Sequence, residues 1–385
     1  MIFVYDNLDP VTGKPIPNLA DPNAKNWDQS WPRVVNLRLL EFFDRAGLQY
    51  SVTDTNSTGW YPIAFSWFDF EIDYIKLIPK AVFEHIQNNR IQLLFYYHEG
   101  DNPKLISKRI DDLCKQWNLP DSWRFISANT NVSTVKNGVY FNDHVNFFAR
   151  INRHQIFTPD VYTKVYTFTL LNRHHKNWRG TITSQLWGKG LLIDALYSYN
   201  TAKDVIEPTD HLDNPISLSD LDNGIDWYNT FKFEQPMYAD NNNSDLHNNH
   251  SQVNQFLYTN SYFQVVMETH FDNDGSNGVF LTEKTYKCIK YQQPFVIASG
   301  AYSVAHLRDE GYNVYDDVID HSYDKIKDNT QRCIALINEI QRLSNIVGPL
   351  WTAQTMRTSE YNAYKFTQAC IESVNNVYKE LLCQK

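Results

Sequence analysis

The sequence predicts an α/β protein of two domains, each built on a mostly parallel sheet. A chain of 385 residues is longer than a single hydrophobic core usually supports. Helical periodicity alternates with short apolar runs in both halves of the chain, which is the pattern of β-α-β units. Pro159 and Asp160 provide a turn between the two halves. We therefore expect one domain at residues 1–155 and a second at residues 156–385.

In the first half, residues 34–46 have helical periodicity and end at Gly47, a common residue just past a helix. Ile91–Tyr97 is a continuous apolar run, typical of a parallel strand that is buried on both faces. Around this strand we expect helices at 75–90 and 104–117 and a short strand near 123–127.

In the second half, residues 161–171 alternate in polarity and are rich in β-branched side chains, which predicts a strand. A polar turn separates this strand from a helix at 179–189. Further along we expect strands at 196–199, 262–267, 294–298 and 312–315, and helices at 282–291, 304–310, about 322–346 and about 351–382.

The composition narrows the classes of protein that fit. The hydrophobic share of 42% and the charged share of 21% are those of a globular chain. The longest apolar runs are far shorter than the roughly 20 residues that span a bilayer, and the N-terminus lacks the pattern of a secretory signal. We therefore expect a cytoplasmic protein with no membrane partner. A net charge of −9 disfavours a broad nucleic-acid surface but allows a local basic track.

Metal and disulfide chemistry are not predicted. The five cysteines are widely spaced and include no CxxC pair, so we expect buried thiols rather than a zinc site or a disulfide framework. Residues 240–250 are rich in Asn, Asp and His, and we interpret them as an exposed loop rather than a metal site. We expect neither a metal nor a separate cofactor.

Polar residues follow two of the predicted strands of the second half. Asn172, Arg173, Lys176 and Arg179 come after the strand at 161–171 and lead into a helix. Ligands of open α/β sheets bind at the carboxyl ends of strands, where helix N-termini attract phosphates. These cations and amides therefore predict a diphosphate site, with a solvated basic loop as the alternative. Glu268 follows the strand at 262–267 and is suited to accept hydrogen bonds from sugar or ribose hydroxyls, or to pair with an Arg.

A third segment places a cation at the start of a helix. Thr282 is a good N-cap, so Glu283 and Lys284 fall in the first turn of the helix at 282–291. The helix dipole favours Glu but opposes Lys at that position. An anionic partner such as a phosphate explains the Lys, and a surface salt bridge is the alternative.

Together these segments resemble the donor-binding signature of the α-1,3-fucosyltransferase family. That signature has a Glu-Asn-Ser segment, then Tyr-Val-Thr-Glu-Lys and a Pro-Val-Val-x-Gly strand. The matching residues here are Glu268, Phe280-Leu281-Thr282-Glu283-Lys284, Pro294-Phe295-Val296-Ile297 and Gly300, while Asn172 and Arg179 are similar to the family's Ser-Asn loop and following Arg. The resemblance covers roughly residues 169–300, and Thr269 departs from it by replacing the family's Asn. The pattern is most similar to fucosyltransferase-like proteins of viral genomes, which would place the chain in the host cytoplasm.

The resemblance implies a GT-B fold, with two Rossmann-like domains facing a central cleft, and a glycosyltransferase that uses a nucleotide-sugar donor without an obligatory metal. It implies that Glu283 holds the donor's ribose, while Lys284 and Arg179 hold its phosphates. The acceptor would be a glycan or another hydroxyl compound. Two alternatives stay open: a non-catalytic nucleotide- or glycan-binding module, and an enzyme that glycosylates modified DNA bases, for which Arg150, Arg153, His154, Arg173 and Lys176 offer a local track.

An inverting transfer needs a general base near the acceptor hydroxyl, and in a GT-B enzyme this base usually comes from the N-terminal domain. The buried strand Ile91–Tyr97 ends in His98-Glu99-Gly100-Asp101. Glu99 is the first candidate, followed by Asp101 and His98, and Asp69 after the aromatic run at 65–68 is another. A turn residue without a catalytic role is the alternative for each of them.

Overall fold

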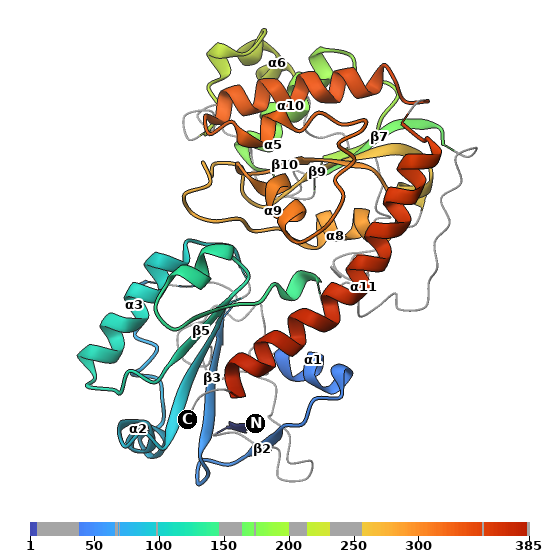
Figure 1. Cartoon of the computed structure of the whole chain (residues 1–385). Helices are drawn as coiled ribbons and strands as arrows, with labels where there is room; N and C mark the ends of the chain where they lie inside the picture. The colour runs from blue at the N-terminus through green and yellow to red at the C-terminus, as the bar shows by residue number, and fades with distance from the viewer. Residues whose placement is uncertain are drawn as a thin grey trace. The chain divides into compact units, whose positions relative to one another are not determined.

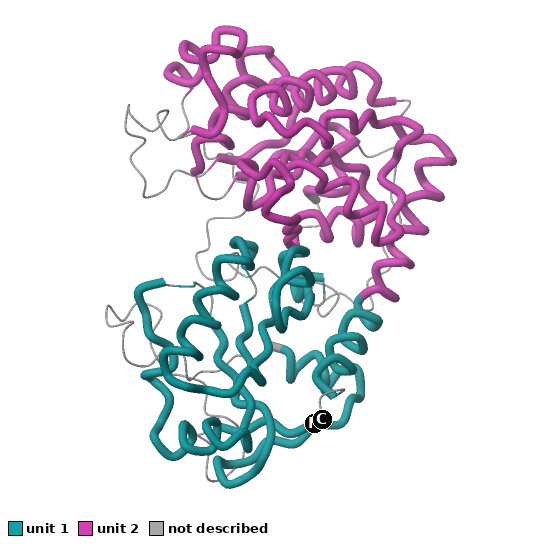
Figure 2. The backbone as a smooth tube through the Cα atoms, turned by 60° about the vertical axis from the view of Figure 1, so that its left-hand side comes forward, with its two compact units in different colours: residues 1–146, 370–385 teal, residues 147–369 magenta. Residues whose placement is uncertain are grey.

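The computed structural model describes residues 1–5, 38–65, 68, 70–97, 99–145, 164–172, 175–199, 214–231, 256–348 and 350–382. The chain divides into two compact units, Met1–Asn146 with Cys370–Lys385 and Phe147–Ala369 (Figure 2). Each unit contains a parallel sheet with helices packed beside it (Figure 1). The α/β class with parallel sheets is therefore confirmed, and both sheets are compatible with Rossmann-like domains.

The described residues of unit 1 form a six-stranded parallel sheet in the order β2-β1-β3-β4-β5-β6. Its strands are β1 (Ile2–Val4), β2 (Ser51–Thr53), β3 (Gly59–Phe65), β4 (Ile91–Tyr97), β5 (Arg124–Ser127) and β6 (Gly138–Tyr140). Its helices are α1 (Arg38–Ala46), α2 (Lys80–Gln87) and α3 (Pro103–Gln116), with a 3-10 turn η2 (Thr130–Thr134).

Both faces of this sheet are buried. On β4, Leu93 and Phe95 point into a core formed with α2 and α3. Leu94 and Tyr96 point into a second core, formed with α1 and with the C-terminal part of α11 (Ala353–Leu382). Alternation of side chains across a strand explains why the apolar run of β4 is unbroken.

The described residues of unit 2 form a four-stranded parallel sheet in the order β10-β9-β7-β8. The strands are β7 (Tyr166–Asn172), β8 (Leu196–Tyr199), β9 (Ser261–Met267) and β10 (Phe295–Ala298). Helices α5 (Asn177–Gly188) and α10 (Asn329–Ser344) lie on one face of the sheet, and α8 (Glu283–Lys290) and α9 (Ser303–Asp309) lie on the other (Figure 1). The shorter elements are α6 (Gly224–Thr230), α7 (Phe256–Thr259), η5 (Leu218–Asp220) and η6 (Ser322–Lys325).

The two sheets share one winding pattern. In each, the second strand along the chain lies outside the first, and the third and fourth strands continue on the other side. This is the doubly wound order 2-1-3-4, whose ligand crevice lies at the carboxyl ends of the first and third strands. In unit 2 that switch point lies between β7 and β9, and in unit 1 it lies between β1 and β3.

Helix α11 belongs to both units. Its N-terminal part packs in unit 2, where Phe366 stacks on Tyr286 with ring centroids 5.9 Å apart. Its C-terminal part packs in unit 1, where Val374 and Leu381 enter the core and Trp60 Nε1 donates to the Leu381 carbonyl at 3.3 Å. The division therefore differs from the expected 156–385 domain, because residues 370–382 belong to unit 1 and pack against one face of its sheet.

Most predicted elements are present, but two expectations of the second half are wrong. Residues 312–315 form no strand, because the side chain of Asn362 takes up both backbone hydrogen-bonding groups of Asn313. Asn362 Nδ2 donates to the Asn313 carbonyl at 2.6 Å, and Asn362 Oδ1 accepts from the Asn313 N–H at 2.9 Å. The helix expected at 322–346 is broken between η6 and α10. Arg332 donates to the carbonyls of Ile326 and Lys327, and Asp328 caps α10 by accepting from the backbone N–H of Gln331 at 2.8 Å.

Two simpler expectations concern cysteines and membrane crossing. The four described cysteines, Cys114, Cys288, Cys333 and Cys370, are buried free thiols, as expected, and Cys383 lies outside the described residues. Within the described part of the chain, no helix combines the length and the apolar character that a bilayer crossing requires.

Candidate functional site

The switch point of unit 2 gathers most of the residues predicted to bind a donor. Strand β7 ends at Asn172 and is followed by Lys176 and by Arg179 in the first turn of α5. Strand β9 ends at Met267 and is followed by Glu268. Helix α8 starts at this same edge of the sheet, because the carboxylate of Glu268 is bonded to its first turn. Arg173 lies outside the described residues.

Glu268 is a buried structural carboxylate, with 0% of its surface exposed. Its Oε1 accepts from the backbone N–H of Thr282 at 3.1 Å and from Thr285 Oγ1 at 2.6 Å, and its Oε2 accepts from Thr282 Oγ1 at 2.7 Å. Thr282 is the N-cap of α8, as predicted, and its hydroxyl also accepts from the backbone N–H of Lys284. In this structure the acceptor positions expected for ligand hydroxyls are used to fix α8 against the end of β9.

Arg179 is also buried, with 5% of its surface exposed. Its guanidinium donates to the backbone carbonyls of Glu268 at 2.6 Å and Met267 at 3.3 Å, and not to the Glu268 carboxylate. Burial lowers the pKa of Arg179 from its usual value, while the charges of nearby acidic groups, including Glu283, oppose this shift. Arg179 therefore ties α5 to the end of β9.

Asn172 completes this polar framework. Its Nδ2 donates to Thr183 Oγ1 at 3.1 Å, and Thr183 in turn donates to the backbone carbonyl of Arg179 at 2.7 Å. Asn172, Arg179 and Glu268 therefore hold α5 and α8 at the ends of β7 and β9. The predicted residues therefore meet at one site, but Asn172, Arg179 and Glu268 are buried and serve to position the surrounding helices.

Two lysines, from the N-terminal ends of two different helices, converge on Thr269 next to this framework. Lys176 Nζ donates to the backbone carbonyl of Thr269 at 2.8 Å. Lys284 Nζ donates to Thr282 Oγ1 at 2.8 Å and lies 3.5 Å from the hydroxyl of the same Thr269. We call Lys176 and Lys284 the lysine pair. They come from the N-terminal ends of α5 and α8, where the helix dipoles oppose positive charge.

The charge of Lys284 is balanced in part by two carboxylates, so the salt bridge named as the alternative is present in the structure. Lys284 Nζ is 3.7 Å from Glu283 and 3.9 Å from Glu268, and its side chain is one-third exposed. Glu283 is buried, with 7% of its surface exposed. Lys176 is the N-cap residue of α5, and its side chain makes no capping hydrogen bond. Two cations at two helix N-termini make an arrangement suited to a diphosphate.

The candidate general bases lie in unit 1. Glu99 and Asp101 follow β4, and Asp101 accepts a hydrogen bond from the Tyr97 hydroxyl. Burial, and next the charge of Asp101, raise the pKa of Tyr97 well above its usual value. Asn129 Nδ2 donates to the Gly100 carbonyl at 2.8 Å and fixes the turn between the two carboxylates. Asp69 and His98 lie outside the described residues.

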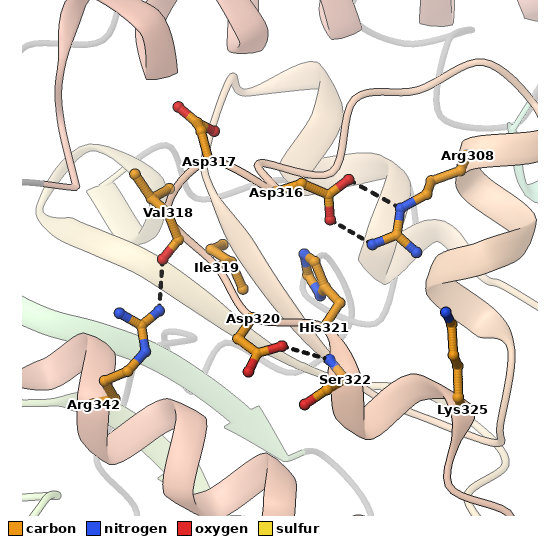
Figure 3. A pocket seen from close by; sticks show the side chains of 10 residues that line it. All are labelled: Arg308, Asp316, Asp317, Val318, Ile319, Asp320, His321, Ser322, Lys325 and Arg342. Atoms are coloured by element: carbon orange, nitrogen blue, oxygen red, sulfur yellow. Dashed lines mark hydrogen bonds and ion pairs between the residues drawn. The ribbon is translucent and has the colours of Figure 1, made fainter.

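Two features of unit 2 were missed by sequence reasoning. The first is Thr285, whose position three residues after the N-cap could have indicated a second hydroxyl near Glu268. The second is a pair of adjoining cavities, of about 730 and about 510 Å³, lined by residues between 308 and 361 and by none of the predicted site residues (Figure 3). The lysine pair, and not these cavities, matches the switch point at which ligands of such sheets bind.

Metal ligation has no visible support in the described residues. Within the described ranges no group of three or more His, Cys, Asp or Glu side chains is arranged to hold a metal ion. The polar loop at 240–250 lies outside the described residues.

Comparison of the chain with models of known families, with curated proteins and with solved structures gives no match.

Proposed function

We propose that this chain is a glycosyltransferase of the GT-B type that moves a sugar from a nucleotide-sugar donor to an acceptor hydroxyl, with inversion and without a metal. The observation that carries the proposal is the convergence of Lys176 and Lys284 on Thr269 at the switch point of unit 2. The resemblance of the segments around Glu268 and Thr282 to the α-1,3-fucosyltransferase signature supports the same activity.

The chemistry assigns a role to each group. As the bond from the anomeric carbon to the donor oxygen breaks, the leaving nucleoside diphosphate keeps the electron pair. Lys176 and Lys284 stabilise the added negative charge on its phosphates, which is work that a divalent metal performs in other transferases. Glu283 accepts hydrogen bonds from the ribose hydroxyls beside them.

The acceptor hydroxyl loses its proton to a general base as its oxygen attacks the opposite face of the sugar. Glu99 is our candidate for this base. Asp101 is the weaker candidate, because its carboxylate already accepts the Tyr97 hydroxyl.

Isothermal titration with UDP, GDP, ADP and CMP in excess chelator tests the donor site. We expect at least one nucleotide to bind, and we expect the double variant Lys176→Ala/Lys284→Ala to weaken that nucleotide by about 3–5 kcal/mol. Lys287→Ala, in the last turn of α8, is the matched control and should bind as the wild type does.

Release of the nucleotide from a matching nucleotide sugar then reports turnover. A chain that binds none of the four nucleotides, or binds one only when a metal is added, would refute the proposed donor site. Binding without any turnover, with every acceptor class tried, would leave a nucleotide-binding module instead of an enzyme.

A further inference from the structure

The two cavities of unit 2 adjoin at three shared lining residues. Both are lined by Arg308, Asp316 and Asp317. One end is lined further by Lys325 and Arg342 (Figure 3), and the other end is lined by Gln354 and Tyr361 of α11. Taken singly, the volumes of about 730 and about 510 Å³ fall within the range of about 300–1,000 Å³ that is usual for ligand pockets, and both cavities are widely open to solvent. We call this surface the groove.

The wall of the groove is a loop that is held rigidly although it contains no helix or strand from residue 312 to residue 321. Arg342 donates to the Val318 carbonyl at 2.6 Å, and the Asp320 N–H donates to Glu339 at 2.9 Å. His321 Nε2 lies 2.6 Å from the Val314 carbonyl. The backbone of the loop is therefore anchored at several points before any ligand arrives.

A strained residue fixes the direction of this loop. Tyr315 is fully buried and has φ +67°, a left-handed conformation that a bulky side chain rarely adopts. Its hydroxyl lies 3.0 Å from Ser359 Oγ on α11, and its ring packs edge-on against Phe295. Strain of this kind persists only where the surroundings enforce it, and it is concentrated at functional sites.

The charges of the groove are largely cancelled in pairs. Arg308 Nε donates to Asp316 at 3.0 Å in a two-pronged contact, and Arg342 forms the same type of contact with Glu339 at 2.7 and 2.6 Å. The groove therefore has no strong electrostatic field of either sign. It contains planar guanidinium and carboxylate groups that lie side by side. Such groups match the adjacent hydroxyls of a neutral polyol better than a phosphate or a cationic peptide.

An aromatic ring lies at the α11 end of the groove. Tyr361 is half exposed, and its hydroxyl donates to the Gly311 carbonyl at 3.0 Å, so the ring is held in place by its tip. A tyrosine fixed in this way presents a rigid apolar surface at a small entropic cost on binding. The apolar C–H face of a sugar ring stacks on such a surface, while its hydroxyls face the polar side chains.

We propose that the groove is an oligosaccharide-binding site, separate from the lysine pair. Tyr361 stacks on one sugar ring. The carboxylate of Asp317 accepts hydrogen bonds from sugar hydroxyls, and the Arg308–Asp316 pair both donates hydrogen bonds to hydroxyls and accepts hydrogen bonds from them. The groove would hold a glycan whether or not the chain transfers sugars, so this inference does not depend on the proposed function.

Saturation-transfer NMR and titration calorimetry with chitotetraose, cellotetraose, maltotetraose and N-acetyllactosamine test the proposal. We expect at least one probe to bind with a dissociation constant of about 1 mM or tighter. Tyr361→Ala and Asp317→Ala should each weaken that probe about 10-fold. Tyr364→Ala is the matched control, because Tyr364 is 65% exposed on the same helix but does not line the groove.

The outcomes separate the alternatives. If none of the four probes binds at about 10 mM, or if tetralysine binds at the groove in their place, the proposal is wrong. If a probe binds but only variants of Lys176 and Lys284 weaken it, the glycan occupies the lysine-pair site and the proposal is also wrong. Far-UV circular dichroism of each variant verifies that the fold is retained, and Tyr361→Phe, which keeps the ring, should bind more tightly than Tyr361→Ala.

Discussion

Replacing Glu268 should destabilise unit 2 without directly removing a ligand contact. Its carboxylate accepts three hydrogen bonds, from the N–H and hydroxyl of Thr282 and from the hydroxyl of Thr285, at 2.6–3.1 Å. Each hydrogen bond to a buried charge contributes about 1.5–3 kcal/mol, and such bonds within one network do not add fully. Removing one side of a buried charged network costs about 3–5 kcal/mol in total. We expect that loss in the free energy of unfolding of unit 2 for Glu268→Ala.

The conservative variant Glu268→Gln should lose about 1–3 kcal/mol. Its amide oxygen can still accept from the Thr282 N–H and from Thr285, but its NH₂ group faces the Thr282 hydroxyl, which already accepts from Lys284 and would lose its own acceptor. Thr285→Val removes one donor and is the partner for a double-mutant cycle. We expect a coupling energy of about 0.5–3 kcal/mol between the two positions.

Hydrogen exchange of peptides from α8 and β9 measures these changes locally, which is needed because a chain of two units does not unfold in a single step. Peptides from the unit 1 sheet serve as the internal control and should keep their protection. If Glu268→Gln leaves exchange unchanged but weakens nucleotide binding, the carboxylate contacts the ligand and its assignment as a structural residue is incorrect.

Four further predictions follow from the described contacts. Glu283→Gln should weaken the binding of nucleoside and of nucleoside diphosphate alike by about 1.5–3 kcal/mol in calorimetry. Affinities equal to those of the wild type would exclude a role for Glu283 at the ribose. Glu99→Gln should lower turnover about 10²-fold with donor affinity unchanged, and retained turnover would exclude it as the base. Burial lowers the pKa of His321, so below about pH 6.5 the unfolded chain binds more protons than the folded chain. As the pH decreases in that range, the free energy of unfolding should decrease by up to about 1.4 kcal/mol per pH unit. His321→Gln should remove this contribution in urea titrations, and an unchanged pH dependence would contradict the prediction. Leu381→Ala, at a buried position, should cost unit 1 about 2–5 kcal/mol, whereas the neighbouring Leu382→Ala, at an exposed one, should cost under about 0.5, and equal costs would argue against α11 covering this sheet.

Elements with strong local signals could be predicted from the sequence. The unbroken apolar run of β4 predicts a buried strand, and Thr282 predicts the start of α8 because it is a good N-cap. Both predictions match the structure. Strand β3 gave no such signal, because it contains Pro62, which cannot donate to a neighbouring strand. Strands β1, β2 and β6 are three residues long, too short for alternation to stand out.

The long-range features could not be predicted in this way. The sequence of α11 predicts one amphipathic helix, and its pattern does not indicate that the last turns pack in unit 1. Glu268 reads as a carboxylate at a strand end, and whether it faces a ligand or the first turn of α8 depends on packing that brings Thr282 and Thr285 to it. Residue type and spacing indicated the position of the site, and tertiary contacts decide which of its residues are exposed.

Strand order explains both the lysine pair and the choice of base. Lys176 and Lys284 are far apart in the sequence, yet β7 and β9 are neighbours, so the helices that follow these strands place both lysines at one residue, Thr269. In unit 1 the same order puts the switch point at the ends of β1 and β3, and Glu99 follows β4, one strand away. Strand order therefore favours a base from the turn after β4, and we expect Glu99 rather than Asp101 to serve, because the Asp101 carboxylate already accepts the Tyr97 hydroxyl.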